Sequence, residues 1–362
     1  MNITFETIEK TLVALRGHMK VRGLSLKTRK AYEAMVRRFL IWQKDHWDKV
    51  QPMKPEERMN TFLSYLANNK KRPILFGTQK SYAMAVLYFY REFQGKTIKT
   101  INATRAKNSQ RVFSLLTQEQ LAALFEALPD ACRENYRLLA YLMFGTGMRL
   151  DEVIKLRIKD IRFEEGLIAV QEGKGDKAGL VDMPKSLVSE LRNQIAYART
   201  QYDMDRTLER EGVFLPGGLA TKYPAYPKAW EWYWVFPHWN ETRDEDGLKR
   251  RHHINDFYVQ TAFRDTRRRI GLPEYATAHM MRHCYATFYL KNLLKKVRES
   301  GLDMPDLYGY CREALKKKLR HVSPQTTEIY IHLAMERNEI SDVSPLDVFK
   351  VLPITQEASV SA

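Results

Sequence analysis

Histidine, arginine and tyrosine side chains stand at spacings in this chain that could act together on a phosphate ester. His279 and Arg282 are three residues apart, so they share one face if this segment is helical. Arg149 lies far upstream, and His321 and Tyr330 are nine residues apart near the carboxyl end. Guanidinium groups are planar, permanently charged and bidentate, which suits the binding of a phosphate. Histidine can move a proton, and a tyrosine hydroxyl can be a nucleophile.

The motifs around these residues resemble the tyrosine recombinase (phage integrase) superfamily. In chain order they are Arg149 in FGTGMRLDEV, Lys174 in EGKGDK, His279-x-x-Arg282 in AHMMRH, His321 in LRHVSPQTT and Tyr330 in EIYIH. Dispersed motifs in one order are a more specific signal than a single short pattern. The resemblance extends over most of the chain.

The resemblance implies that two arginines and two histidines bind and polarise the scissile phosphate of DNA. Arg149 and Arg282 would clamp its oxygens without a metal ion, so no cofactor is implied. His279 and His321 would donate hydrogen bonds to the same oxygens or help to deprotonate the nucleophile.

Tyr330 is the nucleophile that the resemblance implies, and it would form a covalent 3′-phosphotyrosine. Lys174, on a hairpin that reaches into the duplex, would protonate the departing 5′ oxygen, and Lys177 is the alternative lysine in the same turn. Glu152 would either orient the upstream arginine or cap the helix that follows it. Its ordinary structural interpretation is a first-turn acid that complements the helix dipole. His283 is a supporting residue beside them.

Each of these residues also has an ordinary structural interpretation. A tyrosine on a helix is commonly a half-buried core residue, and a single arginine on a helix commonly forms a surface ion pair. The GKGDK segment alone would be a turn with solvated lysines. Because independent structural roles rarely follow one family order, the catalytic interpretation is favoured.

The composition predicts a folded protein that binds a polyanion. The chain has 362 residues, 44% of them hydrophobic, which is enough for more than one core. Lysine and arginine total 59 against 43 aspartate and glutamate, for a formal net charge of +16. This excess suits DNA, but it does not distinguish DNA from RNA or from an anionic membrane surface.

Cysteine usage and hydropathy predict the compartment. No apolar run is as long as a bilayer span, and the first residues, MNITFETIEK, lack a signal pattern. Cys132, Cys284 and Cys311 are isolated, which predicts a reducing compartment and no metal site. We therefore expect a cytoplasmic, nucleoid-associated bacterial protein without a membrane partner.

Residues 1–95 are expected to form an all-α module that resembles the SAM-like core-binding domain of the superfamily. Apolar residues follow a helical period here, and Ser25 marks a helix start. Lys27, Arg29 and Lys30 belong to basic clusters near helix ends and loops. Such clusters suit contact with DNA phosphates.

Residues 96–115 are expected to be a basic linker, followed by a catalytic domain, 116–352, and a tail, 353–362. Helical patterns dominate the catalytic domain. Short apolar runs within residues 161–184, separated by glycine-containing turns, predict three antiparallel strands. The expected fold class is therefore mainly α with a small antiparallel β-sheet (α+β).

An aromatic, proline-rich insert at about residues 213–253 distinguishes this chain from a minimal recombinase. It contains WEWYWVFP, from Trp230 to Pro237, and then RRHH, which comprises Arg250, Arg251, His252 and His253. These runs resemble integron integrases, which act on cassette sites folded from single strands with extrahelical bases. Aromatic rings stack an unpaired base for about 1–3 kcal/mol. The tryptophans could also form the core of a small subdomain, and we expect both roles. The expected DNA contacts in the insert are Trp230, Pro237, Arg250, Arg251, His252 and His253.

Two features depart from the family pattern. Arg282 and His321 are 39 residues apart, more than the family usually has. The usual Leu-Gly-His reads Leu319-Arg320-His321. Arg320 therefore either alters this turn or adds a phosphate contact.

We expect a site-specific recombinase of a mobile element that acts like an integron integrase. As a homotetramer that exchanges C-terminal helices, it would cut and join two DNA sites through a Holliday junction. One alternative is a Xer-type or phage-type recombinase on duplex sites. Others are a non-catalytic DNA-binding regulator on this scaffold and a type IB topoisomerase, which would need no partner site.

Overall fold

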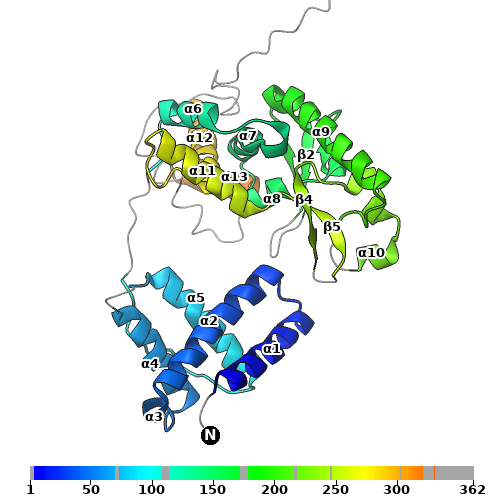
Figure 1. Cartoon of the computed structure of the whole chain (residues 1–362). Helices are drawn as coiled ribbons and strands as arrows, with labels where there is room; N and C mark the ends of the chain where they lie inside the picture. Colours follow the sequence, from blue (N-terminus) through cyan, green and yellow to red (C-terminus); the bar gives the residue numbers. More distant parts are fainter. Residues whose placement is uncertain are drawn as a thin grey trace, which may run out of the picture. The chain divides into compact units, whose positions relative to one another are not determined.

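The computed structural model divides the chain into two compact units, residues 1–113 and 114–362 (Figure 1). The structure describes residues 4–69, 73–107, 114–171, 178–215, 218–244, 247–301, 304–320 and 330. Each unit has its own buried apolar core.

Helices build the N-terminal unit, in which the described residues form no strand. They are α1 (Phe5–Val21), α2 (Leu26–Asp45), α3 (Trp47–Val50), α4 (Pro55–Asn68) and α5 (Phe76–Tyr88), which a π-helical turn, Phe89–Phe93, extends. Ser25 caps α2 through its side chain, and Pro55 occupies the first position of α4. The rings of Phe39, Phe62 and Phe89 pack in the core. The prediction of an all-α module is confirmed.

The described part of the expected linker lies against the N-terminal unit. Backbone N–H groups of Thr100, Asn102 and Thr104 donate to the side chains of Glu56, Asn60 and Ser64 on α4, at 3.0, 2.9 and 2.9 Å. Gln79 on α5 accepts from the N–H of Ala106, and Ile98 is 1% exposed within the core. Residues 96–107 therefore extend this domain beyond the expected boundary at residue 95.

Helices also dominate the C-terminal unit. They are α6 (Gln118–Ala127), α7 (Tyr136–Thr146), α8 (Leu150–Ile154), α9 (Val188–Thr207), α10 (Leu219–Lys222), α11 (Asp256–Arg269), α12 (Ala278–Glu299) and α13 (Met304–Leu319). Thr117 and Gln120 form a capping box at the start of α6. Helix α7 is buried along nearly its whole length and packs against α12 (Figure 1). This pair is the centre of the core on which the candidate site is built.

Two small antiparallel sheets complete the C-terminal unit. Strands β1 (Ile161–Arg162), β2 (Leu167–Val170) and β3 (Gly179–Asp182) form the predicted three-stranded sheet in chain order. Strands β4 (Pro237–Arg243) and β5 (Lys249–His253) form a second hairpin, with a register shift between Pro237 and Glu241. The second sheet was not predicted, because the KRRHH run of β5 lacks the apolar alternation typical of a strand. The mainly α, α+β fold class is confirmed.

The aromatic insert has a core of its own. Buried residues of this core are Ala198, Val213, Leu215, Tyr233 and Trp234. The Arg157 guanidinium lies 3.8 Å from the centre of the Trp234 ring and donates to the carbonyl groups of Trp232 and Phe214. Part of the tryptophan-rich run therefore has a structural role.

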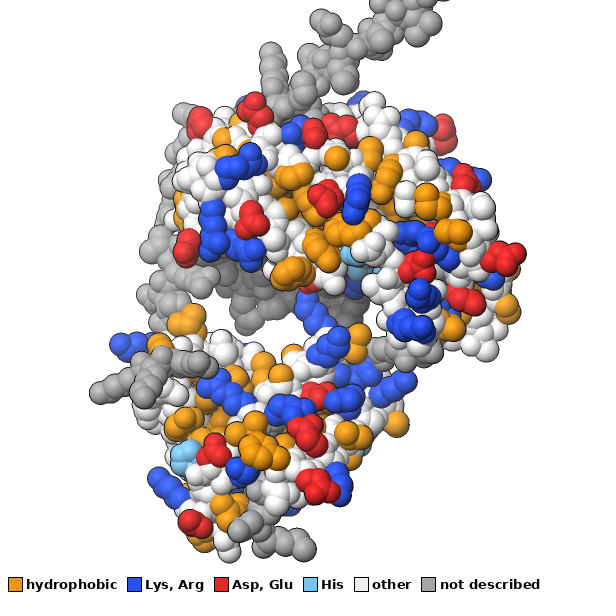
Figure 2. Space-filling model, viewed as in Figure 1, with side chains coloured by type: hydrophobic (Ala, Val, Ile, Leu, Met, Phe, Trp, Pro, Cys, Tyr) orange, Lys and Arg blue, Asp and Glu red, His pale blue; other side chains and the backbone are white. Residues whose placement is uncertain are grey.

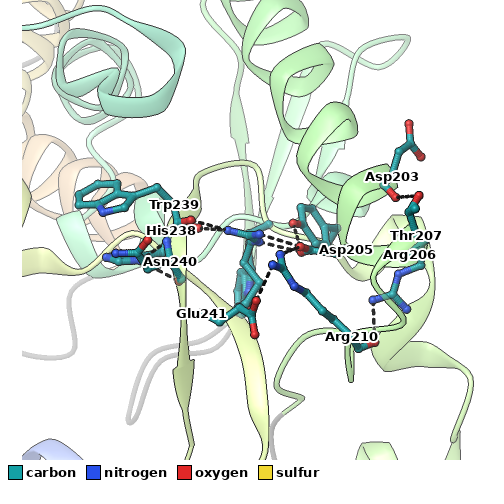
Figure 3. Close-up of polar contacts among 12 residues, drawn as sticks. Asp203, Asp205, Arg206, Thr207, Arg210, His238, Trp239, Asn240 and Glu241 are labelled. Atoms are coloured by element: carbon teal, nitrogen blue, oxygen red, sulfur yellow. Dashed lines mark hydrogen bonds and ion pairs between the residues drawn. The ribbon is translucent and has the colours of Figure 1, made fainter.

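A buried ion-pair network connects β5 to α9 in this subdomain (Figure 3). Arg251, which is 2% exposed, donates from Nε and Nη2 to the carboxylate oxygens of Asp205 at 2.7 and 2.6 Å. Its Nη1 donates to the carbonyl groups of His238 and Trp239 on β4. Tyr233 donates its hydroxyl to Asp205 at 2.6 Å. Burial alone would raise the pKa of Asp205, but the hydrogen bonds from Arg251 and Tyr233 lower it, so Asp205 stays ionised.

We expect Arg251→Ala to lower the free energy of unfolding by about 3–5 kcal/mol, because it leaves the Asp205 carboxylate buried without its bidentate partner. Urea denaturation at neutral pH measures this change. Arg162→Ala is the matched control, since the Arg162–Glu165 pair has side chains that are 44% and 53% exposed. The control should cost at most about 1 kcal/mol. Equal losses for the two variants would contradict a structural role for the network.

Candidate active site

Arg149 follows a tight turn that requires glycine. Helix α7 ends at Gly147, whose φ is +71°, and a Cβ there would lie 2.4 Å from the Tyr285 ring. Arg149 then precedes α8, and its N–H donates to Glu152 Oε2 at 2.8 Å. Its Nη1 donates to Glu152 Oε1 at 2.9 Å. Glu152 therefore both caps α8 and orients Arg149, so the two alternatives for this carboxylate hold together.

Arg282 is buried at the centre of the site. It lies on α12 and is 1% exposed. Its Nη1 donates to the carbonyl oxygen of Gly147 and its Nη2 to that of Leu319, each at 2.6 Å. Burial, together with the positive charge of Arg149, lowers the pKa of Arg282 to about 10, so the group stays cationic at neutral pH. One guanidinium thus connects the turn after α7 with the end of α13.

The hydroxyl of Tyr330 meets the imidazole of His283. Tyr330 Oη lies 2.5 Å from His283 Nδ1, and the His283 ring contacts the His279 ring edge-on at a centroid distance of 4.5 Å. These histidines are one turn apart on α12 and share a face. The contact with the expected nucleophile is therefore made by His283, although the family motif favoured His279. The i, i+4 spacing from His279 is the sequence signal that marks His283.

The electrostatics of the site keep Tyr330 protonated and His279 neutral. Burial raises the pKa of Tyr330 to about 12, against the positive charges of Arg282 and Arg149, which lower it. The pKa of His279 is lowered, first by burial and then by the charges of Arg282 and Arg149. A hydroxyl that stays protonated must pass its proton to another group before it can act as a nucleophile, and His283 is the group that contacts it.

Two expected catalytic residues, Lys174 and His321, lie outside the described residues, as does the alternative Lys177. Strands β2 and β3 flank the lysine segment in the chain. Arg320, the residue before His321, donates from Nη2 to Glu152 at 2.6 Å. The positions of Lys174 and His321 stay predictions.

Basic residues lie at the start of α2 in the N-terminal unit. Lys27 and Lys30 are exposed and Arg29 is half-buried, and the first turn of this helix carries no acidic residue. The positive end of the helix dipole lies at the same place. Figure 2 shows many lysine and arginine side chains on this unit. Positive charge therefore gathers at the start of α2, where the sequence predicts contact with DNA phosphates.

Two expected DNA contacts of the insert, Pro237 and Arg251, lie in its interior. Both residues are buried, and every nitrogen of the Arg251 guanidinium group donates within the network described above. We do not propose these two residues as DNA contacts, because their surfaces are already used to build the subdomain.

The other expected contacts in the insert, Trp230, Arg250, His252 and His253, are half-buried. Arg250 forms an ion pair with Asp244 at 2.7 Å. His253 Nδ1 lies 2.7 Å from the carbonyl oxygen of its neighbour Ile254, and burial lowers the pKa of His253 to about 4. His253 is therefore neutral near pH 7, which leaves Arg250 as the permanent cation of this group.

In the parts of the chain that the structure describes, no three His, Cys, Asp or Glu side chains are grouped to hold a metal ion, and no helix has the length and apolarity to span a bilayer. Cys284 and Cys311 are buried free thiols. Burial raises the pKa of Cys284 to about 12, so it behaves as a small apolar core residue.

Comparison with known proteins places both units in one family. Residues 114–299 match the Phage integrase family, and residues 12–100 match the phage integrase N-terminal SAM-like domain. An integrase/recombinase of Escherichia coli and one of Pseudomonas aeruginosa are each 33% identical over 354 residues, which cover 96% of this chain and 96% of the relative. The chain belongs to the phage integrase family.

More distant matches also carry the names of recombinases and integrases. Tyrosine recombinase XerA of Pyrococcus furiosus is 26% identical over 67% of this chain and 65% of its own length. The structure of XerH bound to palindromic difH has a TM-score of 0.53 and 19% identity, covering 92% of this chain and 82% of that one. The Tn1549 transposon integrase with transposon right end DNA has a TM-score of 0.53 and 14% identity, covering 90% and 97%. These two structures share the fold. The protein is a tyrosine site-specific recombinase.

We expect single-turnover DNA cleavage to change little above neutral pH and to slow as the pH falls below about 6.5, the ordinary pKa of histidine. The lowered pKa of His279 keeps this group neutral at neutral pH, and its protonation at lower pH adds positive charge beside the base. Rates of covalent adduct formation across this range measure the profile.

His283→Phe is the matched variant for this profile, since it keeps a ring and removes the nitrogen that contacts Tyr330. Without the base, the rate should rise roughly tenfold per pH unit, because the tyrosine must then ionise unassisted. A wild-type rate that already rises in this way would contradict general-base catalysis.

Proposed function

We propose that this recombinase cuts and rejoins DNA through Tyr330. The phenolic oxygen would attack the scissile phosphorus, and the new P–O bond forms as the P–O5′ bond breaks. The Tyr330 proton would pass to His283, while Lys174 would supply a proton to the 5′ oxygen. The products are a 3′-phosphotyrosine and a free 5′ hydroxyl. The observation that carries this proposal is the 2.5 Å contact of Tyr330 with His283, next to the positive charges of Arg149 and Arg282.

The phosphate would be held by side chains alone. Arg149 and Arg282 would bind its non-bridging oxygens, with His279 and His321 as further hydrogen-bond donors. Because the phosphotyrosine keeps a phosphoester bond, attack by a 5′ hydroxyl of a partner strand can rejoin the DNA without a cofactor. Two such exchanges would pass through a Holliday junction.

We further propose that the substrates are folded single-stranded sites with extrahelical bases, as for integron integrases. An aromatic stack in the insert supports this proposal. The Tyr226 ring stacks between Tyr223 and Trp232 at centroid distances of 4.6 and 5.0 Å, and Tyr223 is 38% exposed. Lys159 Nζ lies 3.4 Å from the centre of the Trp232 ring. An accessible ring beside cations suits an unpaired base and its phosphate.

Assembly and location follow from the same proposal. A homotetramer that exchanges C-terminal helices would bring two sites together, and Lys27, Arg29 and Lys30 would contact the DNA backbone. In the insert, Trp230, Arg250, His252 and His253 remain proposed contacts. The protein would act on the nucleoid in a bacterial cytoplasm, as part of a mobile element. Xer-type or phage-type action on duplex sites is the alternative.

Tyr330→Phe is expected to abolish the covalent protein–DNA adduct and to leave DNA affinity within about threefold of wild type, because it removes only the nucleophilic oxygen. A nicked suicide substrate followed by a denaturing gel detects the adduct, and gel shift measures affinity. Tyr310→Phe is the control, since Tyr310 is a 54% exposed tyrosine of α13 and its loss should change nothing. An adduct with Tyr330→Phe would place the nucleophile elsewhere. DNA binding by wild type without any adduct would favour the non-catalytic regulator.

The substrate class is tested by offering one recombination-site sequence both as a duplex and as a folded strand with extrahelical bases. We expect the adduct mainly on the folded strand. Tyr223→Ala should lower that yield roughly tenfold, because one stacking surface is lost, and should leave any duplex reaction unchanged. Tyr275→Ala is the matched control, as Tyr275 has the same 38% exposure but lies outside the insert. Adduct on the duplex alone would overturn the folded-strand proposal and retain the recombinase.

A further inference from the structure

Arg320 stands directly after α13, where the family pattern has glycine. Its φ is +53°, in the left-handed region that favours glycine. A side chain is therefore kept here at a conformational cost that glycine would avoid. The contacts of this side chain indicate why it is retained.

The guanidinium of Arg320 shares a carboxylate with that of Arg149. Arg320 Nη2 donates to Glu152 Oε2 at 2.6 Å, and Arg149 Nη1 donates to Glu152 Oε1 at 2.9 Å. The side chains of Arg320 and Glu152 are only 9% and 8% exposed. The pKa of nearby Arg282 is lowered by burial and then by the positive charges of Arg149 and Arg320. Three guanidinium groups thus lie around one carboxylate.

Two donor atoms of Arg320 are unused in the described site. Its Nε and Nη1 are buried, and neither has a hydrogen-bond partner among the described residues. Burying charged donors without partners is unfavourable. The cluster therefore fits an anion that comes from outside the protein.

Strand β3 holds the stem of Arg320 in place. A Cβ at Gly179, the first residue of β3, would lie 3.2 Å from Arg320 Cδ, so glycine leaves room for the stem. Lys318 forms an ion pair with Asp182 at the other end of the strand. The end of α13 thus packs on β3, and the guanidinium group of Arg320 faces Glu152.

We propose that Arg320 is a third phosphate-binding guanidinium of the active site, held by Glu152 until DNA is bound. This inference rests on the proposed cleavage through Tyr330. Negative charge on the non-bridging oxygens grows as the phenolic oxygen attacks, so an added cation stabilises the transition state more than the bound substrate. Arg282, Tyr330 and Arg320 are 1%, 2% and 9% exposed, so all three meet the phosphate only when the site opens to DNA.

The test compares Arg320→Ala with wild type on suicide substrates whose scissile group is either phosphate or methylphosphonate, which lacks the negative oxygen. On phosphate we expect the variant to form adduct roughly 100-fold more slowly, with DNA affinity little changed. On methylphosphonate the two proteins should differ by at most about threefold, because the charge that needs the third cation is missing.

Two further variants keep the test independent of folding. Arg320→Gly removes the guanidinium and suits the left-handed backbone, so it should melt no lower than Arg320→Ala and should repeat the alanine pattern. Lys317→Ala is the matched control, because it removes an exposed cation near the same end of α13. This control should cleave both substrates like wild type.

Equal slowing of Arg320→Ala on both substrates would overturn the phosphate contact and leave Arg320 as a positioning residue for Glu152. Wild-type rates on phosphate for both Arg320 variants would remove any role in cleavage. If wild type binds DNA but forms no adduct, the proposed function fails and this inference fails with it. Normal cleavage by wild type with a charge-dependent loss in the Arg320 variants supports both.

Discussion

The buried guanidinium of Arg282 is the interaction on which the candidate site depends. Its hydrogen bonds to the carbonyl oxygens of Gly147 and Leu319 join segments that lie 135 and 37 residues away in the chain. Removing a guanidinium from water is costly, and well-formed hydrogen bonds must offset that cost. The turn after α7 and the end of α13 are therefore held at the same point of α12, and they carry Arg149 and Arg320 to either side of Glu152.

Three guanidinium groups near one carboxylate are the physical consequence of this arrangement. Glu152 is the carboxylate between Arg149 and Arg320, and Arg282 adds a third cation nearby. The buried, unused Nε and Nη1 of Arg320 favour the binding of an oxyanion, because these donors are already held in place. The same charges act on Tyr330. Burial raises the pKa of Tyr330 to about 12, and the positive charges of Arg282 and Arg149 oppose part of that rise. In the proposed reaction, phosphate binding and activation of the tyrosine would therefore be linked through the same charges.

In the aromatic insert, some residues are buried and structural and others are exposed, and composition does not reveal which are which. Arg251 has the charge of a DNA contact, yet it lies 2% exposed between Asp205 and the carbonyl groups of β4. This network holds the hairpin on α9. It leaves a stack of rings, ending in the partly exposed Tyr223, at the surface. Rigid support of an accessible aromatic surface is what base stacking requires.

The sequence by itself determined the family, the mainly helical fold class and the face shared by His279 and Arg282. Motif order and helical period can be recognised along the chain without knowing which segments meet in space. Only the tertiary structure decided that His283 contacts Tyr330, that Arg251 is interior and that residues 96–107 pack on the N-terminal unit. These facts depend on which side chain of one segment reaches another segment far away in the chain. Local pattern specifies which face of an element is apolar, but the distance between two elements is set by how the whole core packs.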